Sequence, residues 1–237
     1  KYGEQVNVLT VLSYHKLQDV NKLKEALETL QKENPAAVSR VPDVIPAWLG
    51  LQAYGMKDLE TADKYMTWAT QNDQLQNVKK VIWRNLAKVR LALKKYDRAL
   101  VASNNFLKVE DQPYRRADGM LDKASILLGL GKYAEARKTA EEALALGVEG
   151  PLMASLKIVL GDISYAEKKF DEAAKHYGVT AELFVNDAEL KPKALFKAAE
   201  ALDKAGRKSE ASQYRARLQK EFPDWKQEGE SLPPDAR

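Results

Sequence analysis

Cysteine is absent from the 237 residues of this chain, and histidine occurs only twice. The lack of cysteine excludes disulfide bonds and thiolate metal sites, although it assigns no compartment. The two histidines, His15 and His176, lie far apart in the sequence, so they lack the spacing of a zinc site. We therefore expect no metal ion and no cofactor. His176 has charged neighbours on a predicted helix, and we expect it to lie at the surface.

Long apolar stretches are also missing. The longest stretch without a charged residue runs from Val44 to Met56 and has 13 residues. A helix needs about 20 apolar residues to cross a membrane, so we expect no membrane-spanning segment. The chain begins at Lys1 and not at methionine, so we expect a fragment or a processed product, upstream of which a signal peptide or lipid anchor could stand.

Neither sign of charge is in large excess, because 38 basic residues face 34 acidic ones and the net charge is +4. Such a balance requires neither nucleic acid nor an anionic membrane as a partner.

Strand signatures are missing as well, since no stretch alternates apolar and polar residues and no Asn-Gly or Asp-Gly turn lies between candidate strands. The apolar residues follow helical spacing instead, which predicts an all-α fold.

An internal repeat is the main feature that the sequence does have. A glycine or alanine recurs every 37 or 38 residues, and another small residue follows each one after twelve. The first set is Gly50, Ala87, Ala124, Gly161 and Ala199, and the second is Ala62, Ala99, Ala136, Ala173 and Ala211. Because small side chains let two backbones approach closely, these positions are predicted to mark the contact within each helical hairpin. Repetition on this scale indicates a solenoid, whose usual role is to present a binding surface.

The turn inside each hairpin has its own register. The residues that share this register are Val20, Leu59, Tyr96, Tyr133, Phe170 and Lys208. Asp19 and Asp58 are placed as N-caps of the second helix, because a carboxylate accepts the free amide hydrogens of a first turn. Gly131 and Gly206 suit the left-handed residue that commonly ends a helix.

The sequence thus predicts twelve helices in six hairpins that form one domain over residues 1–225. The hairpins are expected at about 4–35, 43–75, 78–112, 113–150, 151–190 and 192–225. Residues 36–42 are expected to form a short linker, and residues 226–237 a flexible tail.

These residues resemble the tetratricopeptide repeat. The third hairpin supplies Trp83, Leu86, Ala87, Tyr96, Ala99 and Phe106, and the fifth supplies Leu160, Gly161, Phe170, Ala173 and Tyr177. The period of 37 to 39 exceeds the 34 that is usual in the family. The sixth hairpin has Lys208 and Arg215 at apolar positions, which is typical of a terminal repeat. The resemblance implies a right-handed superhelical solenoid of about six repeats. The later hairpins are also similar to tetratricopeptide proteins of the bacterial cell envelope.

The same resemblance implies that the first helix of each hairpin lines a concave groove. Carried onto this chain, the expected peptide-binding residues are Tyr54, Arg84, Lys88, Leu91, Ser125, Leu128, Asp162 and Tyr165. The expected wall also includes Val44, Ala47, Leu51, Leu121, Ile158, Phe196, Glu200 and Asp203. Arg84 and Lys88 lie one helical turn apart, so both can reach one anionic group, although an ordinary solvated helix face would look the same.

The carboxylate clamp of some family members is incomplete here. It needs an asparagine on the adjoining first helix, where this chain has Trp48 and Leu51 on one side and Asp122 and Ser125 on the other.

The predicted function is a non-enzymatic scaffold that binds a peptide or protein segment in its groove, in a periplasmic or envelope-associated setting rather than the cytoplasm. Two alternatives stay open, namely a helical-repeat protein that binds nucleic acid and an enzyme with an unrecognised site. The groove positions show no base-reading code, so we expect no nucleic-acid partner. The turn Gly129–Lys132 is not a phosphate loop, because Tyr133 stands where serine or threonine is needed. The sequence leaves the oligomeric state open.

Overall fold

The computed structural model describes residues 2–71, 76–183 and 187–226. It divides into two compact units, Lys1–Glu110 and Asp111–Arg237, which are described separately below. Every regular element in the described residues is a helix, and no strand occurs among them. The prediction of an all-α chain of helix-turn-helix repeats is therefore confirmed, whereas a single array of all six hairpins stays a prediction.

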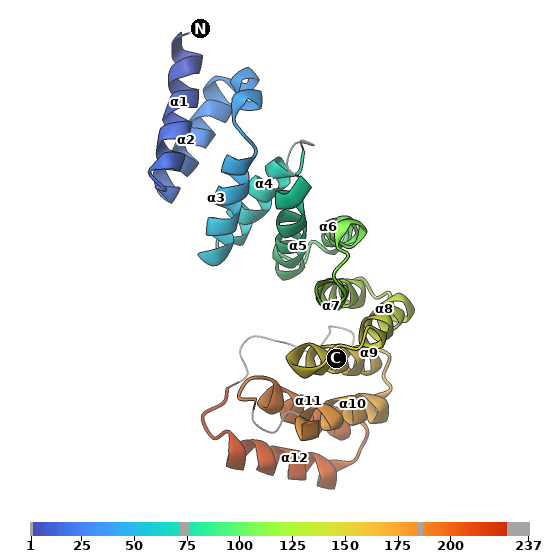
Figure 1. Ribbon diagram of the computed structural model, residues 1–237. Coiled ribbons are helices and arrows are strands. Elements are labelled where there is room, and N and C mark those ends of the chain that lie inside the picture. Colours follow the sequence, from blue (N-terminus) through green and yellow to red (C-terminus); the bar gives the residue numbers. More distant parts are fainter. Residues whose placement is uncertain (1, 72–75, 184–186, 227–237) are drawn as a thin grey trace. The chain divides into compact units, whose positions relative to one another are not determined.

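Each unit consists of three helical hairpins (Figure 1). The helices of the N-terminal unit are α1 (Tyr2–Lys16), α2 (Val20–Glu33), α3 (Val44–Gly55), α4 (Leu59–Ala69), α5 (Gln76–Ala92) and α6 (Tyr96–Val109). The helices of the C-terminal unit are α7 (Pro113–Gly129), α8 (Tyr133–Ala145), α9 (Gly150–Ala166), α10 (Phe170–Leu183), α11 (Leu190–Lys204) and α12 (Lys208–Glu221). The six residues that share the predicted turn register are the first residues of the six second helices, so this register is confirmed.

The repeated small residues do allow close contact between paired helices. A Cβ atom added at Gly50 would lie 2.9 Å from the backbone nitrogen of Met66 on the partner helix. One added at Gly161 would lie 2.7 Å from Cδ1 of Tyr177. The alanines at the two repeated small positions of these five hairpins are all buried: Ala62, Ala87, Ala99, Ala124, Ala136, Ala173, Ala199 and Ala211. Larger side chains at these positions would force the two helices of a hairpin apart.

All six hairpin turns share one backbone conformation. A residue with positive φ stands two places before each second helix, at Gln18, Lys57, Lys94, Gly131, Lys168 and Gly206. The predicted left-handed glycines are therefore confirmed, but four turns use a side-chain-bearing residue in a region that is unfavourable for it. The predicted caps are confirmed too, because Asp19 accepts the amide of Lys22 at 3.0 Å and Asp58 accepts that of Thr61 at 3.1 Å.

The predicted linker differs from the structure, because residues 35–40 form the 3₁₀ helix η1 (Pro35–Arg40). Ala37 and Val41 are buried in the same cluster as Leu27 and Leu30 of α2. Burial of these apolar side chains folds the segment onto the first hairpin. Nearly all of the predicted tail, from residue 227 on, lies outside the described residues, as do the segments 72–75 and 184–186 of two predicted hairpins.

Within the described residues, no helix is both long enough and apolar enough to cross a membrane.

Candidate interaction surface

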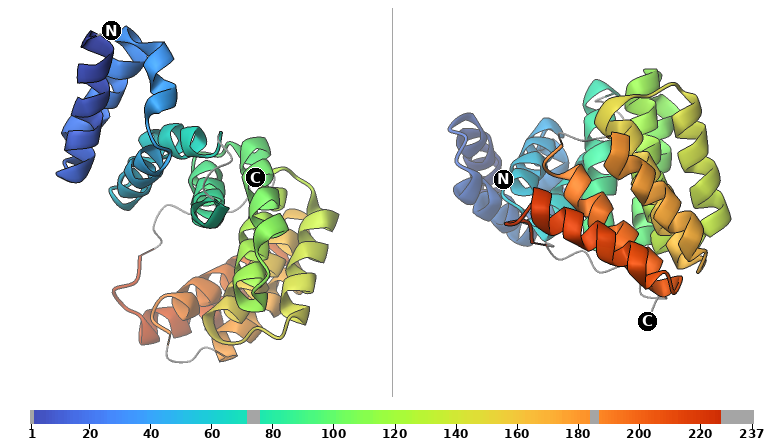
Figure 2. Two further views of the ribbon diagram at one scale, coloured as in Figure 1. Left: turned by 45° about the horizontal axis from the view of Figure 1, so that its top comes forward. Right: turned by 90° about the horizontal axis from the view of Figure 1, so that it is seen from below.

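From the second hairpin on, the first helices of successive hairpins lie next to each other within each unit. In the N-terminal unit α3 contacts α5, and in the C-terminal unit α9 contacts both α7 and α11 (Figure 2). Each unit therefore has a wall of first helices, whose side chains are candidates for contact with a partner.

The predicted site residues of the N-terminal unit lie on α3 and α5. Tyr54 is half-buried near the end of α3, and Arg84, Lys88 and Leu91 are half-buried along α5. The structure thus places the last three along one helix. Arg84 and Lys88 already take part in polar interactions, so a partner anion would have to compete for them.

The predicted site residues of the C-terminal unit have different surroundings. Ser125 and Leu128 are half-buried on α7, and the Ser125 hydroxyl donates to the carbonyl oxygen of Leu121 at 3.1 Å. Tyr165 is only 2% exposed, and its ring packs edge-on against Phe170 with 5.2 Å between ring centroids. Tyr165 therefore belongs to the core of this unit.

Asp162 lies at the centre of a small polar network that the sequence did not reveal. Lys197 of α11 donates to its two carboxylate oxygens at 2.8 and 3.0 Å, and the Tyr177 hydroxyl donates to one of them at 2.5 Å. Burial raises the pKa of Tyr177 well above its ordinary value, and the neighbouring Asp162 adds to this shift. The network ties α9, α10 and α11 together, so the charge of Asp162 is already balanced within the protein.

The last first helix, α11, adds two more side chains to the wall of the C-terminal unit. Phe196 is half-buried, and Trp225 lies beside it with 5.7 Å between ring centroids. Burial raises the pKa of the half-buried Glu200 carboxyl above its ordinary value, although Lys197 and Arg215 act in the opposite direction. Glu200 therefore lies where an added cation would be favourable.

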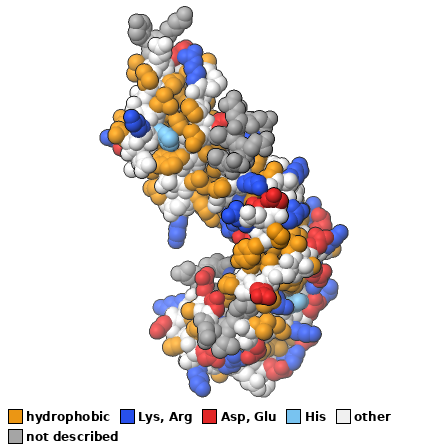
Figure 3. Space-filling view, in the orientation of Figure 1, with side chains coloured by type: hydrophobic (Ala, Val, Ile, Leu, Met, Phe, Trp, Pro, Cys, Tyr) orange, Lys and Arg blue, Asp and Glu red, His pale blue; other side chains and the backbone are white. Residues whose placement is uncertain are grey.

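Ion pairs between hairpins hold the second helices in place. Asp63 of α4 accepts from both Arg90 and Lys95, each at 2.7 Å. Although burial alone would raise the pKa of Asp63, the hydrogen bonds from Lys95 and Arg90 hold it below its ordinary value. In the C-terminal unit Arg137 of α8 donates to Glu167 and Glu172, also at 2.7 Å. Acidic and basic side chains lie close together over much of the visible face of this unit (Figure 3).

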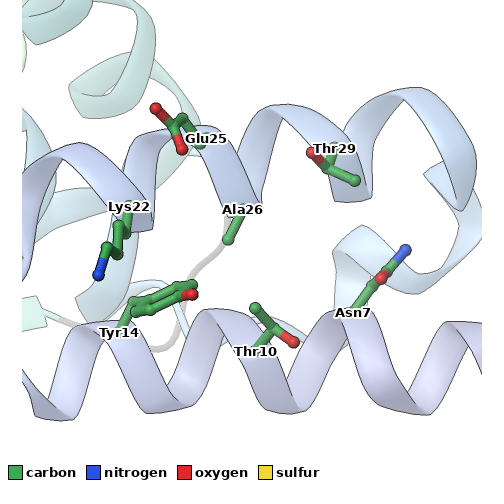
Figure 4. A pocket seen from close by; sticks show the side chains of 7 residues that line it. All are labelled: Asn7, Thr10, Tyr14, Lys22, Glu25, Ala26 and Thr29. Carbon is green, nitrogen blue, oxygen red and sulfur yellow. The ribbon is translucent and has the colours of Figure 1, made fainter.

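Other candidate sites are less suited to chemistry. A cleft of about 210 Å³ lies between α1 and α2 (Figure 4), and its lining residues are Asn7, Thr10, Tyr14, Lys22, Glu25, Ala26 and Thr29. Ligand pockets usually enclose roughly 300–1,000 Å³, so this cleft is small. No cluster of three potential metal ligands occurs in residues 2–71, 76–183 and 187–226.

The two histidines occupy separate structural settings. His15 packs edge-on against Trp48, with 5.4 Å between ring centroids. His176 is half-buried 3.7 Å from Glu172, whereas the sequence predicted a surface position. Burial lowers the pKa of His176 despite the nearby carboxylate.

Comparison with known proteins agrees with this architecture. Residues 121–184 match the family model described as tetratricopeptide repeat. Among curated protein sequences none matches the chain significantly.

Many solved structures share the fold. PilF of Pseudomonas aeruginosa is 17% identical with a TM-score of 0.57, and the alignment covers 94% of this chain and 93% of that one. The apo form of the quorum sensor NprR from B. thuringiensis is 16% identical with a TM-score of 0.65, covering 94% of this chain and 66% of that one. A Rap protein complexed with Competence and Sporulation Factor is 16% identical with a TM-score of 0.64, covering 91% of this chain and 63% of that one. The chain thus spans less than two thirds of the length of the last two proteins.

These similarities agree with the repeated small residues, the shared turn conformation and the adjacent first helices described above. The chain therefore carries tetratricopeptide repeats at residues 121–184, and it has the tetratricopeptide fold over nearly its whole length.

Proposed function

We propose that this protein is a non-enzymatic scaffold that holds an extended peptide or protein segment along its first helices. The observation that carries the proposal is the contact between successive first helices, which aligns half-exposed side chains into a wall in each unit. A packed array of hairpins presents such a wall without first having to be ordered, which lowers the entropic cost of binding.

The chemistry of the C-terminal wall favours a particular kind of segment. Leu121, Leu128 and Phe196 offer apolar surface, and Glu200 supplies a half-buried carboxylate. A partner lysine or arginine beside Glu200 would stabilise its charged form, because a nearby cation offsets the loss of hydration. We therefore propose that this wall binds a segment with apolar side chains and at least one basic residue.

The N-terminal wall has the opposite polarity. Arg84 and Lys88 lie one turn apart on α5, with Leu91 one turn beyond Lys88 and Tyr54 on α3. We propose that this wall binds an acidic group in exchange for the polar interactions that the two cations already make.

The solved structures support the proposal through their fold. The Rap protein is seen with Competence and Sporulation Factor, and NprR is a quorum sensor. Both show that a chain with this fold can serve recognition, and at 16% identity they carry no information about the partner of this protein.

A peptide selection tests the proposal. A displayed library of random peptides would be panned against the whole chain, and the affinity of selected peptides would be measured for three proteins. These are the parent, Glu200→Gln and the matched control Glu141→Gln, whose carboxyl is exposed on α8. We expect peptides that contain basic residues to lose at least about fivefold in affinity with Glu200→Gln and to be unaffected by the control. Failure to select any peptide, or equal effects of both variants, would refute the proposal.

A nucleic-acid partner is the alternative that the same material can test. Phosphate contacts weaken steeply as salt rises, because binding releases counterions from the nucleic acid. The proposal expects no retention on immobilised single-stranded RNA at 150 mM salt, and salt-sensitive retention would favour the alternative.

The cellular setting belongs to the same proposal. The similarity of the later hairpins to tetratricopeptide proteins of the bacterial cell envelope supports a periplasmic or envelope-associated protein. Fractionation of bacteria that express the tagged full-length gene product would test this, and recovery in the cytosolic fraction alone would contradict it.

A further inference from the structure

Glu200 is a half-buried carboxylate on α11 that makes no hydrogen bond or ion pair with another described residue. Other carboxylates of the C-terminal unit that burial affects are paired, since Asp162 accepts from Lys197 and Glu167 accepts from Arg137. Burial raises the pKa of Glu200, so the loss of water costs its charged form more than the surrounding cations return. Glu200 therefore lacks the counter-ion that the other two carboxylates have.

The cations that act on Glu200 are already engaged or well solvated. Lys197 donates to both carboxylate oxygens of Asp162, and Arg215 pairs with Asp203. Lys204 is exposed at the end of α11, where water screens its charge. A cation that a partner brought to Glu200 would therefore meet a carboxylate whose charge is not yet balanced.

Two aromatic rings extend the same part of the wall. Phe196 stands four residues before Glu200, so the two side chains share one face of α11. The ring of Trp225 lies 5.7 Å from that of Phe196 between centroids, and the two ring planes are tilted by 45°. Both rings are half-buried, so each keeps some surface that a partner can contact.

The position of Trp225 is set by packing onto α11. The amide of Trp225 donates to the carbonyl oxygen of Phe222 at 3.1 Å. Phe222 in turn packs against the buried cluster that contains Ala194 and Leu195 of α11. The segment after α12 therefore holds the indole ring beside Phe196 before any partner binds.

We propose that Phe196, Glu200 and Trp225 form a site for the arginine side chain of a bound segment. The inference rests on the proposed function and names the residue that the C-terminal wall recognises. A planar guanidinium can stack on aromatic rings, which attract its charge, and can donate two parallel hydrogen bonds to one carboxylate. Lysine suits the site less well, because its ammonium is a compact and strongly hydrated point charge.

Titration of the whole chain with a blocked arginine, N-acetyl-arginine N-methylamide, tests the proposal. Trp225 is a suitable reporter, because the other tryptophans, Trp48, Trp68 and Trp83, belong to the N-terminal unit. The NMR signal of its indole N–H is identified by its loss in Trp225→Phe. We expect this signal to move with a dissociation constant on the order of 10 mM or below. No movement up to about 100 mM would overturn the proposal.

Two further blocked amino acids test what the site recognises. Citrulline has nearly the shape of arginine but no charge, and we expect it to leave the Trp225 signal in place. Blocked lysine should bind at least about threefold more weakly than blocked arginine, because it lacks the planar group. Equal binding of citrulline and arginine would overturn the role of charge, and equal binding of lysine and arginine would overturn the preference for a guanidinium.

Protein variants test the assignment of the residues. Glu200→Gln should weaken the binding of blocked arginine at least about fivefold, and Phe196→Leu should weaken it about two- to fivefold. The matched control is Glu141→Gln, whose carboxyl is exposed on α8, and it should bind as the parent does. Unchanged indole signals of the other tryptophans would show that each variant keeps its fold. Equal losses with Glu200→Gln and Glu141→Gln would overturn the assignment.

The probe needs no selected peptide, so this proposal and the proposed function can fail separately. If peptides are selected but blocked arginine does not bind, the arginine site is refuted and the scaffold stands. If blocked arginine binds but no peptide is ever selected, the scaffold is refuted and the site stands.

Discussion

Gly161 gives the sharpest test of how the hairpins pack. It lies inside α9, and a Cβ atom there would be 2.7 Å from Cδ1 and 2.8 Å from Cζ of Tyr177. Tyr177 is fully buried, and its hydroxyl is bonded to Asp162, so the ring has little freedom to move. Forcing an extra methyl group into a packed core costs roughly 1–3 kcal/mol. Replacing glycine by alanine inside a helix contributes about 1 kcal/mol in the other direction. Gly161→Ala is therefore expected to destabilise the C-terminal unit by about 1 kcal/mol.

The sign of this effect should reverse when the ring is removed. In a Tyr177→Ala background only the helix-propensity gain remains, so Gly161→Ala should stabilise the unit by about 1 kcal/mol. The coupling between the two positions is then about 2 kcal/mol, which is large enough for a double-mutant cycle to resolve. Hydrogen exchange of the α9 and α10 amides is the suitable assay, because it reports the opening free energy of this part of the chain.

A matched control is Gly55→Ala, because a Cβ atom at Gly55 has no neighbour within 4 Å. It should not destabilise α3. If Gly161→Ala had the same effect with and without the Tyr177 ring, the close contact between α9 and α10 would be refuted.

Three further predictions concern the turns and the ion pairs. Asp63→Asn should lower the free energy of unfolding by roughly 3 kcal/mol, because it breaks a buried ion pair with Arg90. Glu28→Gln, at an exposed ion pair, should cost under about 1 kcal/mol. Urea unfolding would compare the two variants, and equal losses would contradict the assignment of the Asp63 pair as the buried one. The pKa of Asp63 is lower in the folded state, so the stability that its charged form contributes is fully present above the ordinary pKa of 3.8 and is lost as the pH falls through the folded pKa. The difference in stability between the parent and Asp63→Asn should therefore shrink in acid titrations below about pH 3.8. Lys94 and Gly131 both have positive φ, so Lys94→Gly should stabilise the N-terminal unit by about 0.5–1 kcal/mol and Gly131→Ala should destabilise the C-terminal unit by a similar amount. Thermal melting that showed changes of the opposite sign would count against a left-handed turn.

The repeat register was predictable from sequence because it depends on local features. Asp19 and Asp58 cap helices through amides only three residues later, and Gly50 and Gly161 contact the partner helix of their own hairpin. The left-handed conformation of Lys57 and Lys94 was missed because lysine has no intrinsic preference for it. Alignment of these lysines with Gly131 and Gly206 would have revealed it, since the packed helices impose the same turn on every hairpin.

The side chains of the candidate surface were harder to predict, because their exposure depends on neighbours that are distant in sequence. Tyr165 has a groove position in the repeat register, yet it is buried against Phe170. Asp162 was predicted as a groove residue, but its partner Lys197 comes from the next hairpin, about one period later. The contact of Trp225 with Phe196 likewise depends on how the segment after α12 returns to α11.

Hydrogen exchange of the whole chain with and without a selected peptide tests the central claim most directly. Amides of the first helices α7, α9 and α11 should become protected when the peptide binds to the C-terminal wall, while those of α8, α10 and α12 should change little. Protection confined to the second helices would contradict the account.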